Sequence, residues 1–242
     1  MPETPVGLQS SHDRRRPEAE EIEVTVLYED DWLIAIDKPP GMVVHPTYKN
    51  WSGTLLNALL WRTRGREAVV PSIITRLDKH TSGLVLVALS AGIHAQVQRD
   101  AETGRVMKEY LAVVEGLPSP LAGTITLPLA RSPEDRRRVV VIDSGQPSET
   151  RYEVLSTTGE RSVVRCQLVT GRTHQIRVHL AASGWPIVGD EVYGQPHPLI
   201  TRQALHAWRV SLTHPVTRNP LEIETSVPLD LQQVLADQNF TL

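Results

Sequence analysis

The chain has 242 residues, of which 40% are hydrophobic and 22% are charged, the composition of a globular protein with one sizeable core or two small ones. No apolar run approaches the roughly 18 residues that a membrane-spanning helix needs, so the sequence predicts no membrane partner. The single cysteine, Cys166, excludes an intrachain disulfide and a cysteine-rich metal site, which fits a cytoplasmic location.

The net charge of −3 argues at first sight against a nucleic-acid partner, because lysine and arginine usually drive phosphate binding. The first 23 residues, however, hold three arginines against six acidic residues, which leaves 22 basic and 22 acidic residues in the rest of the chain. An RNA-binding protein with such a neutral body needs its basic groups clustered on one face.

The N-terminal segment differs in composition from the rest. Residues 1–22 mix Pro, Ser, Arg and Glu without a hydrophobic period, so we expect a disordered tail there and one folded domain over residues 23–242. The tail lacks the apolar stretch of a signal peptide. Short β-rich segments follow at 23–28 and 32–37, and residues 38–41 (Lys-Pro-Pro-Gly) predict a rigid turn.

The remaining pattern predicts more strands than helices. A short helix is expected at 54–61, then a strand at 83–89 that is almost continuously apolar and hence buried on both faces, then a helix capped by Ser90 and ended by Gly104. Further strands are expected at 106–115, 150–155, 162–170, 204–212 and 221–225. This order favours an α+β fold with a mainly antiparallel sheet over a doubly wound fold.

One more helix is expected at 173–183. Thr173 is its predicted N-cap, Ile176 and Leu180 lie four residues apart on one face, and Gly184 ends it. Unpaired backbone N–H groups at its start, with Arg172 nearby, suit a phosphate or a carboxylate. The alternative from the pattern alone is an amphipathic surface helix with a solvated polar face.

A second dense polar stretch lies at 74–83, directly before the buried strand. A loop that opens into a rigid strand is a good platform for a catalytic group, and Asp78 is the candidate. The structural alternative is a local ion pair of Asp78 with Arg76 or Lys79. Tyr110, within an expected strand, is by pattern a core residue. The arginine runs at 62–66 and 131–138 are either solvated loops or phosphate contacts.

The sequence contains no motif for binding a metal or a nucleotide cofactor. His174 and His179 are five residues apart, which does not match the i, i+4 spacing of a zinc helix, so no metal site is expected. The Gly-rich fingerprints of dinucleotide and ATP binding are missing. We therefore expect no cofactor.

Together these segments resemble the RluA-type pseudouridine synthases, whose signature R-L-D-x-x-T-S-G-L matches residues 76–84. The other matching motifs are Asp37-Lys38-Pro39-Pro40-Gly41, Val44-His45-Pro46, Lys108-Glu109-Tyr110, residues 170–179, Gly189-Asp190 with Tyr193-Gly194, Gln203-Ala204-Leu205-His206-Ala207 and His214-Pro215. Many relatives have His in place of Thr75, and many carry an N-terminal S4 RNA-binding domain for which the short tail leaves no room. The resemblance therefore implies a stand-alone catalytic domain.

The resemblance implies an isomerase that converts uridine in RNA to pseudouridine, on a mixed, mainly antiparallel sheet with flanking helices and a central active-site cleft. In it, Asp78 is the essential carboxylate, Arg177 pairs with it, and Tyr110 stacks on the extruded uracil and takes the C5 proton. Ile176 forms an apolar wall of the base pocket and Arg76 reaches the RNA. Three further residues complete the expected RNA-binding set: Arg172, His174 and Thr81.

Two other functions compete with this interpretation. One is a non-catalytic RNA-binding factor for ribosome assembly on the same fold, against which the retention of Asp78, Tyr110 and Arg177 argues. The other is a hydrolase that uses Asp78 as nucleophile, but no partnering acid, metal site or oxyanion motif is visible. The partner is expected to be structured ribosomal or transfer RNA with a flippable uridine, and the protein a monomer, because no long apolar interface stripe stands out.

Overall fold

The structure, a computed structural model, describes residues 16–237. The expected tail lies mostly outside the described residues, and the predicted division at residue 22 stays a prediction. Within the described part, the chain already contacts the body before that point. The Glu18 carbonyl accepts a hydrogen bond from Asn57 Nδ2 at 2.7 Å, and a Glu20 carboxylate oxygen accepts one from the Gly53 N–H at 2.9 Å.

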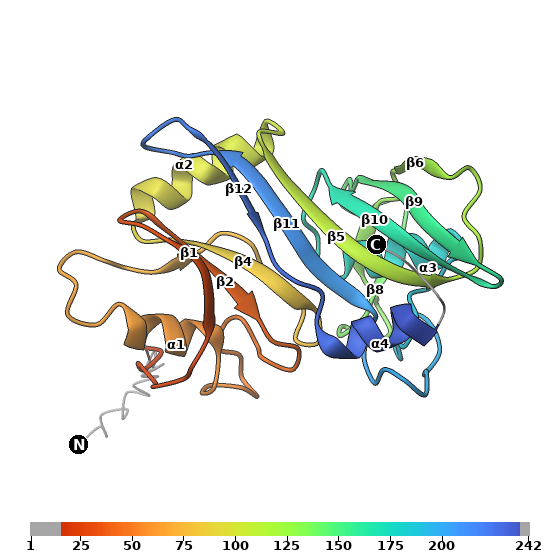
Figure 1. The fold of residues 1–242 in the computed structure, drawn as a ribbon, viewed down its shortest axis with the longest axis horizontal. Coiled ribbons are helices and arrows are strands. Elements are labelled where there is room, and N and C mark those ends of the chain that lie inside the picture. The colour runs from red at the N-terminus through yellow and green to blue at the C-terminus, as the bar shows by residue number, and fades with distance from the viewer. Residues whose placement is uncertain (1–15, 238–242) are drawn as a thin grey trace, which may run out of the picture.

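One long, twisted sheet runs through the molecule, with helices on both of its faces (Figure 1). The strands of its main path are, in spatial order, β1 (Thr25–Glu29), β2 (Leu33–Lys38), β4 (Ser82–Ala88), β11 (Leu205–Thr213), β5 (Val106–Glu115), β10 (Arg161–Leu168), β9 (Thr150–Thr158) and β6 (Ala122–Ile125). Two short strands join at the side: β3 (Ser72–Ile73) pairs with β4, and β12 (Pro220–Glu224) pairs with β11. A separate hairpin consists of β7 (Leu129–Arg131) and β8 (Val139–Val141).

All strand pairs in the large sheet are antiparallel except β4 with β11. That parallel junction has only two residue pairs, His206 with Ser82 and Ala207 with Gly83. It joins the half-sheet β1–β4 to the half-sheet of β11, β5, β10, β9 and β6. The predicted α+β class with a mixed, mainly antiparallel sheet is therefore confirmed.

Four helices occur in the described residues: α1 (Leu55–Arg62), α2 (Ala91–Glu102), α3 (Gln175–Ala182) and α4 (Leu229–Asp237). Thr54 caps α1 in a capping box with Asn57, and Ser90 Oγ accepts the Ile93 N–H at the start of α2. The Ser90 cap agrees with the sequence prediction, whereas Thr54 was predicted as the first residue of its helix and not as a cap. Among these described residues, no helix is long and apolar enough to span a membrane.

Strand β4 is buried along its whole length because helices cover both of its faces. Leu84 and Leu86 pack with Val97 of α2, whereas Val85 and Val87 pack with residues of α1. Successive residues of a strand point to opposite faces, so a strand sandwiched in this way must be apolar at every position. The prediction from its continuous apolar run is confirmed.

The start of α3 differs from the prediction. The N-cap is His174, in a left-handed conformation with φ 54° and without a side-chain cap, so the prediction of Thr173 was wrong. The physical reason is the Gln175 side chain, whose Oε1 accepts hydrogen bonds from the Arg172 N–H at 2.9 Å and from Thr170 Oγ1 at 2.8 Å. Gln175 thereby ties the incoming loop to the first turn, a role that a cap residue usually has.

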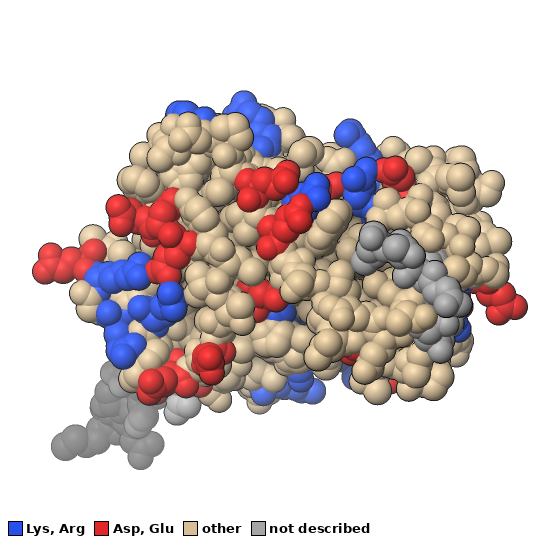
Figure 2. All heavy atoms as spheres, viewed as in Figure 1, with Lys and Arg blue, Asp and Glu red and all other residues tan. Residues whose placement is uncertain are grey.

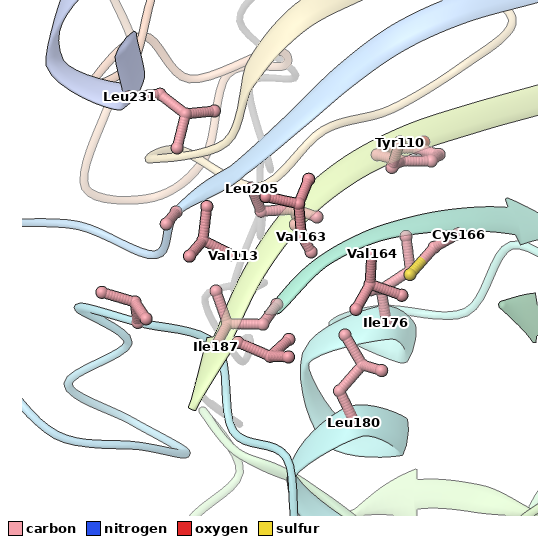
Figure 3. Packing of buried hydrophobic residues seen from close by; sticks show 14 of the residues in the cluster. Tyr110, Val113, Val163, Val164, Cys166, Ile176, Leu180, Ile187, Leu205 and Leu231 are labelled. Carbon is pink, nitrogen blue, oxygen red and sulfur yellow. The ribbon is translucent and has the colours of Figure 1, made fainter. Parts of the chain in front are cut away.

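Helix α3 is also not a surface helix. Its residues from Gln175 to Leu180 are all buried, so the alternative of a solvated polar face was wrong. Ile176 and Leu180 project toward Val164 and Cys166 of β10 in one hydrophobic cluster (Figure 3).

Five neighbouring strands, β12, β11, β5, β10 and β9, carry a row of alternating charges. Arg209 of β11 contacts Glu224 of β12 and, with 3.7 Å between Nη1 and Oε2, Glu109 of β5. Arg165 of β10 contacts Glu109 at 3.6 Å between Nε and Oε1, and also Glu153 of β9. We call these five residues the ion ladder. Figure 2 shows acidic and basic side chains interleaved on this face of the molecule.

Candidate active site

The loop that carries Asp78 leads from β3 into β4 and is held from several sides. The Thr81 N–H donates to the Asp78 carbonyl at 3.1 Å, and Gln203 Nε2 donates to Thr81 Oγ1 at 3.0 Å. Lys38 Nζ, fully buried at the end of β2, donates to the Lys79 carbonyl at 3.2 Å and to two carbonyls of its own turn. These contacts leave the loop little conformational freedom and so fix the position of Asp78.

Arg177 of α3 lies between two carboxylates. Its Nη1 donates to Asp78 Oδ2 at 2.9 Å, while Nε and Nη2 donate to the two oxygens of Asp190 at 2.7 and 2.9 Å. Burial alone disfavours the charge of Arg177, but the hydrogen bonds and charge of Asp190, followed by Asp78, outweigh it and raise its pKa. Arg177 is therefore a permanent cation with one fixed orientation.

Asp190 is itself positioned by a tight turn. Its carboxylate is 1% exposed and accepts the backbone N–H groups of Val192 and Tyr193 at 3.0 and 3.2 Å. Burial raises the pKa of a carboxyl, yet the guanidinium of Arg177 more than compensates and the pKa of Asp190 is lowered. Gly189 enters the turn at φ +72°, where a Cβ would meet the Ile200 carbonyl oxygen at 3.0 Å. The turn thus requires glycine at this position.

Tyr110 and Ile176 form the floor of a small pocket beside Asp78, with a volume of about 50 Å³. Tyr110 comes from β5 and is 6% exposed, and Ile176 comes from α3 and is 3% exposed. Burial, and next the charge of Asp78, raises the pKa of the Tyr110 phenol. Tyr110 is therefore a neutral phenol at pH 7.

His174 faces Asp78 from the start of α3. The distance from His174 Nε2 to Asp78 Oδ2 is 3.8 Å, and Nδ1 is 2.8 Å from the Tyr193 hydroxyl. Tyr193 also accepts the Val139 N–H at 2.8 Å, so its own proton is free for His174 Nδ1, which leaves Nε2–H facing Asp78. Burial lowers the pKa of His174, against the opposing effect of Asp78. A neutral His174 results.

All eight residues proposed from the sequence line this one pocket. They are Asp78, Tyr110, Arg177, Arg76, Ile176, Arg172, His174 and Thr81. Arg76 and Arg172 lie at its rim, and Thr81 is buried with its hydroxyl engaged by Gln203. Thr75 stands where many relatives have His and does not line the pocket. Its Oγ1 instead accepts the Leu86 N–H at 2.8 Å.

Sequence reasoning missed two residues that shape the site, Asp190 and Tyr193. Both occur in a motif that supported the resemblance, Gly189-Asp190 with Tyr193-Gly194, but no role was assigned to them. The available signal was the glycine directly before an acid, which indicates a turn that presents a carboxylate. No cluster of three or more potential metal ligands occurs among the described residues.

Comparisons with known proteins place this geometry in a family. The family model described as RNA pseudouridylate synthase matches residues 32–182. This chain belongs to that family. The synthase is 41% identical over 240 residues to "Ribosomal large subunit pseudouridine synthase D" of Nitrosomonas europaea, covering 95% of this chain and 69% of the relative. The equally named protein of Zymomonas mobilis is 36% identical over 231 residues, with coverages of 89% and 73%.

Solved structures agree with the fold. "Human RNA Pseudouridylate Synthase Domain Containing 4" superposes on the synthase with a TM-score of 0.73 at 26% identity, covering 90% of this chain and 94% of that one. The expected resemblance and fold are therefore confirmed, and so is the expected activity class. The synthase is an RNA-modifying isomerase, and RNA is its partner.

Proposed function

We propose that this synthase converts one or more uridines of large-subunit ribosomal RNA to pseudouridine, with Asp78 as the essential carboxylate. The names of the relatives at 41% and 36% identity support ribosomal RNA over transfer RNA. The observation that carries the catalytic assignment is the 2.9 Å contact of Asp78 with the buried Arg177, at the mouth of a pocket that Tyr110 and Ile176 line.

The reaction sets clear demands on such a site. The N-glycosidic bond of uridine must break, the uracil must rotate while it is held, and a C–C bond must form at C5. Asp78 serves this chemistry by attacking the uracil ring, by attacking the ribose, or by removing a ribose proton. In each case the carboxylate must be aimed at the nucleotide, and the 2.9 Å hydrogen bond from Arg177 Nη1 fixes its orientation.

The uracil is held by the remaining pocket walls. Tyr110 stacks on the extruded base, and Ile176 closes the apolar side. A neutral phenol is a weak base, so Tyr110 accepts the C5 proton only while it passes its own O–H proton to a water that enters the pocket. His174, neutral and with Nε2 3.8 Å from Asp78 Oδ2, directs its N–H dipole toward the carboxylate and favours its negative charge.

RNA is held at the rim by Arg76 and Arg172, whose guanidinium groups suit phosphate oxygens. Thr81 is buried and contributes by holding the conformation of the loop that carries Asp78. Extrusion of the nucleotide costs a few kcal/mol, which contacts made only in the extruded state offset.

The synthase is further proposed to act as a cytoplasmic monomer without a cofactor, as a catalytic domain over residues 23–242. All eight proposed site residues come from one chain, so a second copy is not needed to complete the pocket. An isomerisation changes neither the atoms nor the electrons of the substrate, so it requires no redox partner or co-substrate.

Pseudouridine mapping of total RNA tests the proposal. Cells that lack the gene receive the wild-type or the Asp78→Asn copy, and we expect one or more large-subunit ribosomal sites to vanish and to return only with the wild type. Return of the sites with Asp78→Asn overturns the role of Asp78. If no site depends on the gene although the protein binds ribosomal RNA, the assembly-factor function replaces this proposal.

A further inference from the structure

A second hollow of about 450 Å³ adjoins the Asp78 pocket. The two share Arg76 and Arg172 as lining residues, so both arginines face both spaces. The other lining residues come from the β7–β8 hairpin, the loop behind it and the loop before α3: Leu129, Ala130, Arg131, Val139, Ser144, Gly145, Gln146, Gly171 and Thr173.

The walls of this hollow are anchored to the proposed active site. The Val139 N–H donates to the Tyr193 hydroxyl at 2.8 Å, and Arg138 Nη2 donates to the Val192 carbonyl at 2.8 Å. Leu129 and Val139 pack against Val178 of α3 in one small apolar cluster. The hairpin is therefore fixed relative to α3, and the hollow is a built feature of the fold.

The charged residues that line the hollow are all positive. Three arginines line it and no acidic residue does. Arg131 Nη1 donates to the Arg136 carbonyl at 2.8 Å and Arg172 Nε to the Pro147 carbonyl at 3.3 Å, so within residues 16–237 both make their hydrogen bonds to backbone carbonyls. The charge of Arg131 also contributes to the lowered pKa of His174, after burial and the charge of Arg177. Arg131 thus acts electrostatically on the inner pocket.

We propose that this hollow binds the nucleotide adjacent to the target uridine on the same RNA strand, with its phosphate on Arg131 and Arg172. The inference rests on the proposed function and adds a second subsite to it. The volume lies within the roughly 300–1,000 Å³ range of small-molecule sites, which suits one nucleotide. Because Arg76 and Arg172 border both spaces, the phosphodiester that links the two nucleotides lies between them. The synthase therefore requires two consecutive nucleotides to leave the stack.

Methylphosphonate scanning tests this subsite. The probe is a synthetic RNA stem–loop that carries the mapped uridine, and single phosphates around the uridine are replaced in turn by uncharged methylphosphonates. Binding is measured with the Asp78→Asn protein and with Asp78→Asn proteins that also carry Arg131→Ala or Arg136→Ala. Arg136 lies in the same hairpin but outside the hollow, and alanine there keeps the carbonyl that Arg131 uses.

The expected result is a specific coupling. Arg131→Ala lowers the affinity about tenfold, and one methylphosphonate within two nucleotides of the uridine lowers it similarly, but the two changes together lower it no further. Arg136→Ala weakens binding less and couples to no single phosphate. The proposal is overturned if Arg131 couples to no phosphate, or if its effect equals that of Arg136. Failure of the proposed function is distinct, because the wild-type protein then leaves the unmodified stem–loop unchanged.

Discussion

At the scale of single residues, the site depends on a cation shared by two carboxylates. Arg177 offsets the cost of burying the Asp190 charge through its Nε and Nη2, and it uses Nη1 for Asp78. A bidentate pair fixes the plane of a guanidinium far better than one contact does. Asp190 is therefore a positioning residue that acts on Asp78 through Arg177.

Asp190→Asn is expected to lower kcat by about 100-fold while KM for RNA changes less than about threefold, because a misaimed Arg177 affects the chemical step and not the rim contacts. Single-turnover kinetics on the modified RNA measure this. Asp30→Asn is the matched control, because it alters another carboxylate that accepts two backbone N–H groups and contacts a buried side chain, His214, and it lies outside the pocket. Equal losses of kcat in both variants, at equal thermal stability, contradict the positioning role.

Sequence motifs identified the residues of the proposed site but not which of them are buried or paired. Asp78 and Arg177 are 99 positions apart, and only the family resemblance suggested their pairing before the structure showed it. Asp190 was overlooked because one-dimensional patterns do not distinguish a fully buried acid from a solvated one. Its burial follows from the turn at Gly189 and from α3, both of which are tertiary features.

At the scale of elements, turns and strand junctions hold the Asp78 loop. Lys38 at the end of β2 donates to carbonyls on both its own turn and the loop, which ties two segments together. Burial, followed by the charge of Arg202, lowers the pKa of Lys38 to about 7 from 10.5.

This shift has a defined effect on stability. Between pH 7 and pH 10.5 the unfolded chain binds more protons at Lys38 than the folded chain, so the contribution of Lys38 to stability rises with pH across that window. Lys38→Met removes the titration. We expect the melting temperature of the wild type, minus that of the variant, to increase from pH 7 to about pH 9.5 in thermal scans. A constant difference contradicts the prediction.

Gly83 occupies the parallel junction of β4 and β11 at φ +109°. A Cβ there would lie 2.8 Å from the Ala207 nitrogen and carbonyl carbon, so no side chain fits. Gly83→Ala should cost about 3 kcal/mol or more and lower the melting temperature by roughly 6–12 °C. Gly104→Ala is the control, because Gly104 also has a positive φ but open space around it, and it should cost only about 1 kcal/mol. Similar losses at both positions refute the steric explanation.

The sequence predicted the long elements well and the short ones poorly. Strands β5 and β4 and the cap at Ser90 follow from local patterns. Strands β3, β6, β7 and β8 have two to four residues, too few for a period, and exist because a partner strand is already in place. Helix α4 was also missed. Its residues Leu231 and Val234 are buried against the central core, a contact that local sequence does not reveal.

At the scale of the whole molecule, the neutral body becomes compatible with an RNA substrate. Glu109 and Tyr110 are neighbours on β5 and point to opposite faces of the sheet, so the ion ladder lies on the face away from the Asp78 pocket. Each of its three acids contacts Arg165 or Arg209 there. Within residues 16–237, Arg76, Arg131 and Arg172 of the rim and the adjoining hollow form no ion pair, so their charge is available for phosphate.

Two arginine variants with the same change in net charge test whether the arginines at the pocket, and not those of the ion ladder, bind RNA. Arg172→Ala should weaken RNA binding about tenfold and reduce the slope of log affinity against log salt by about one, whereas Arg165→Ala in the ion ladder should leave both nearly unchanged. Filter binding between 50 and 200 mM salt measures both quantities. Equal effects of the two variants indicate that only overall charge matters.

The two-pair junction of β4 and β11 also determines how the two half-sheets are held together. Seven residue pairs join β5 to β10, but two join the half-sheets, directly after the loop of Asp78. Across that seam run the contacts of Arg177 with Asp78, Arg202 with His80, Gln203 with Thr81 and His206 with Ser82. Because only two residue pairs join the half-sheets, these side-chain contacts carry much of the attachment between them, beside the pocket. Single substitutions along it can therefore retune the stiffness of the enzyme during evolution without rebuilding either half.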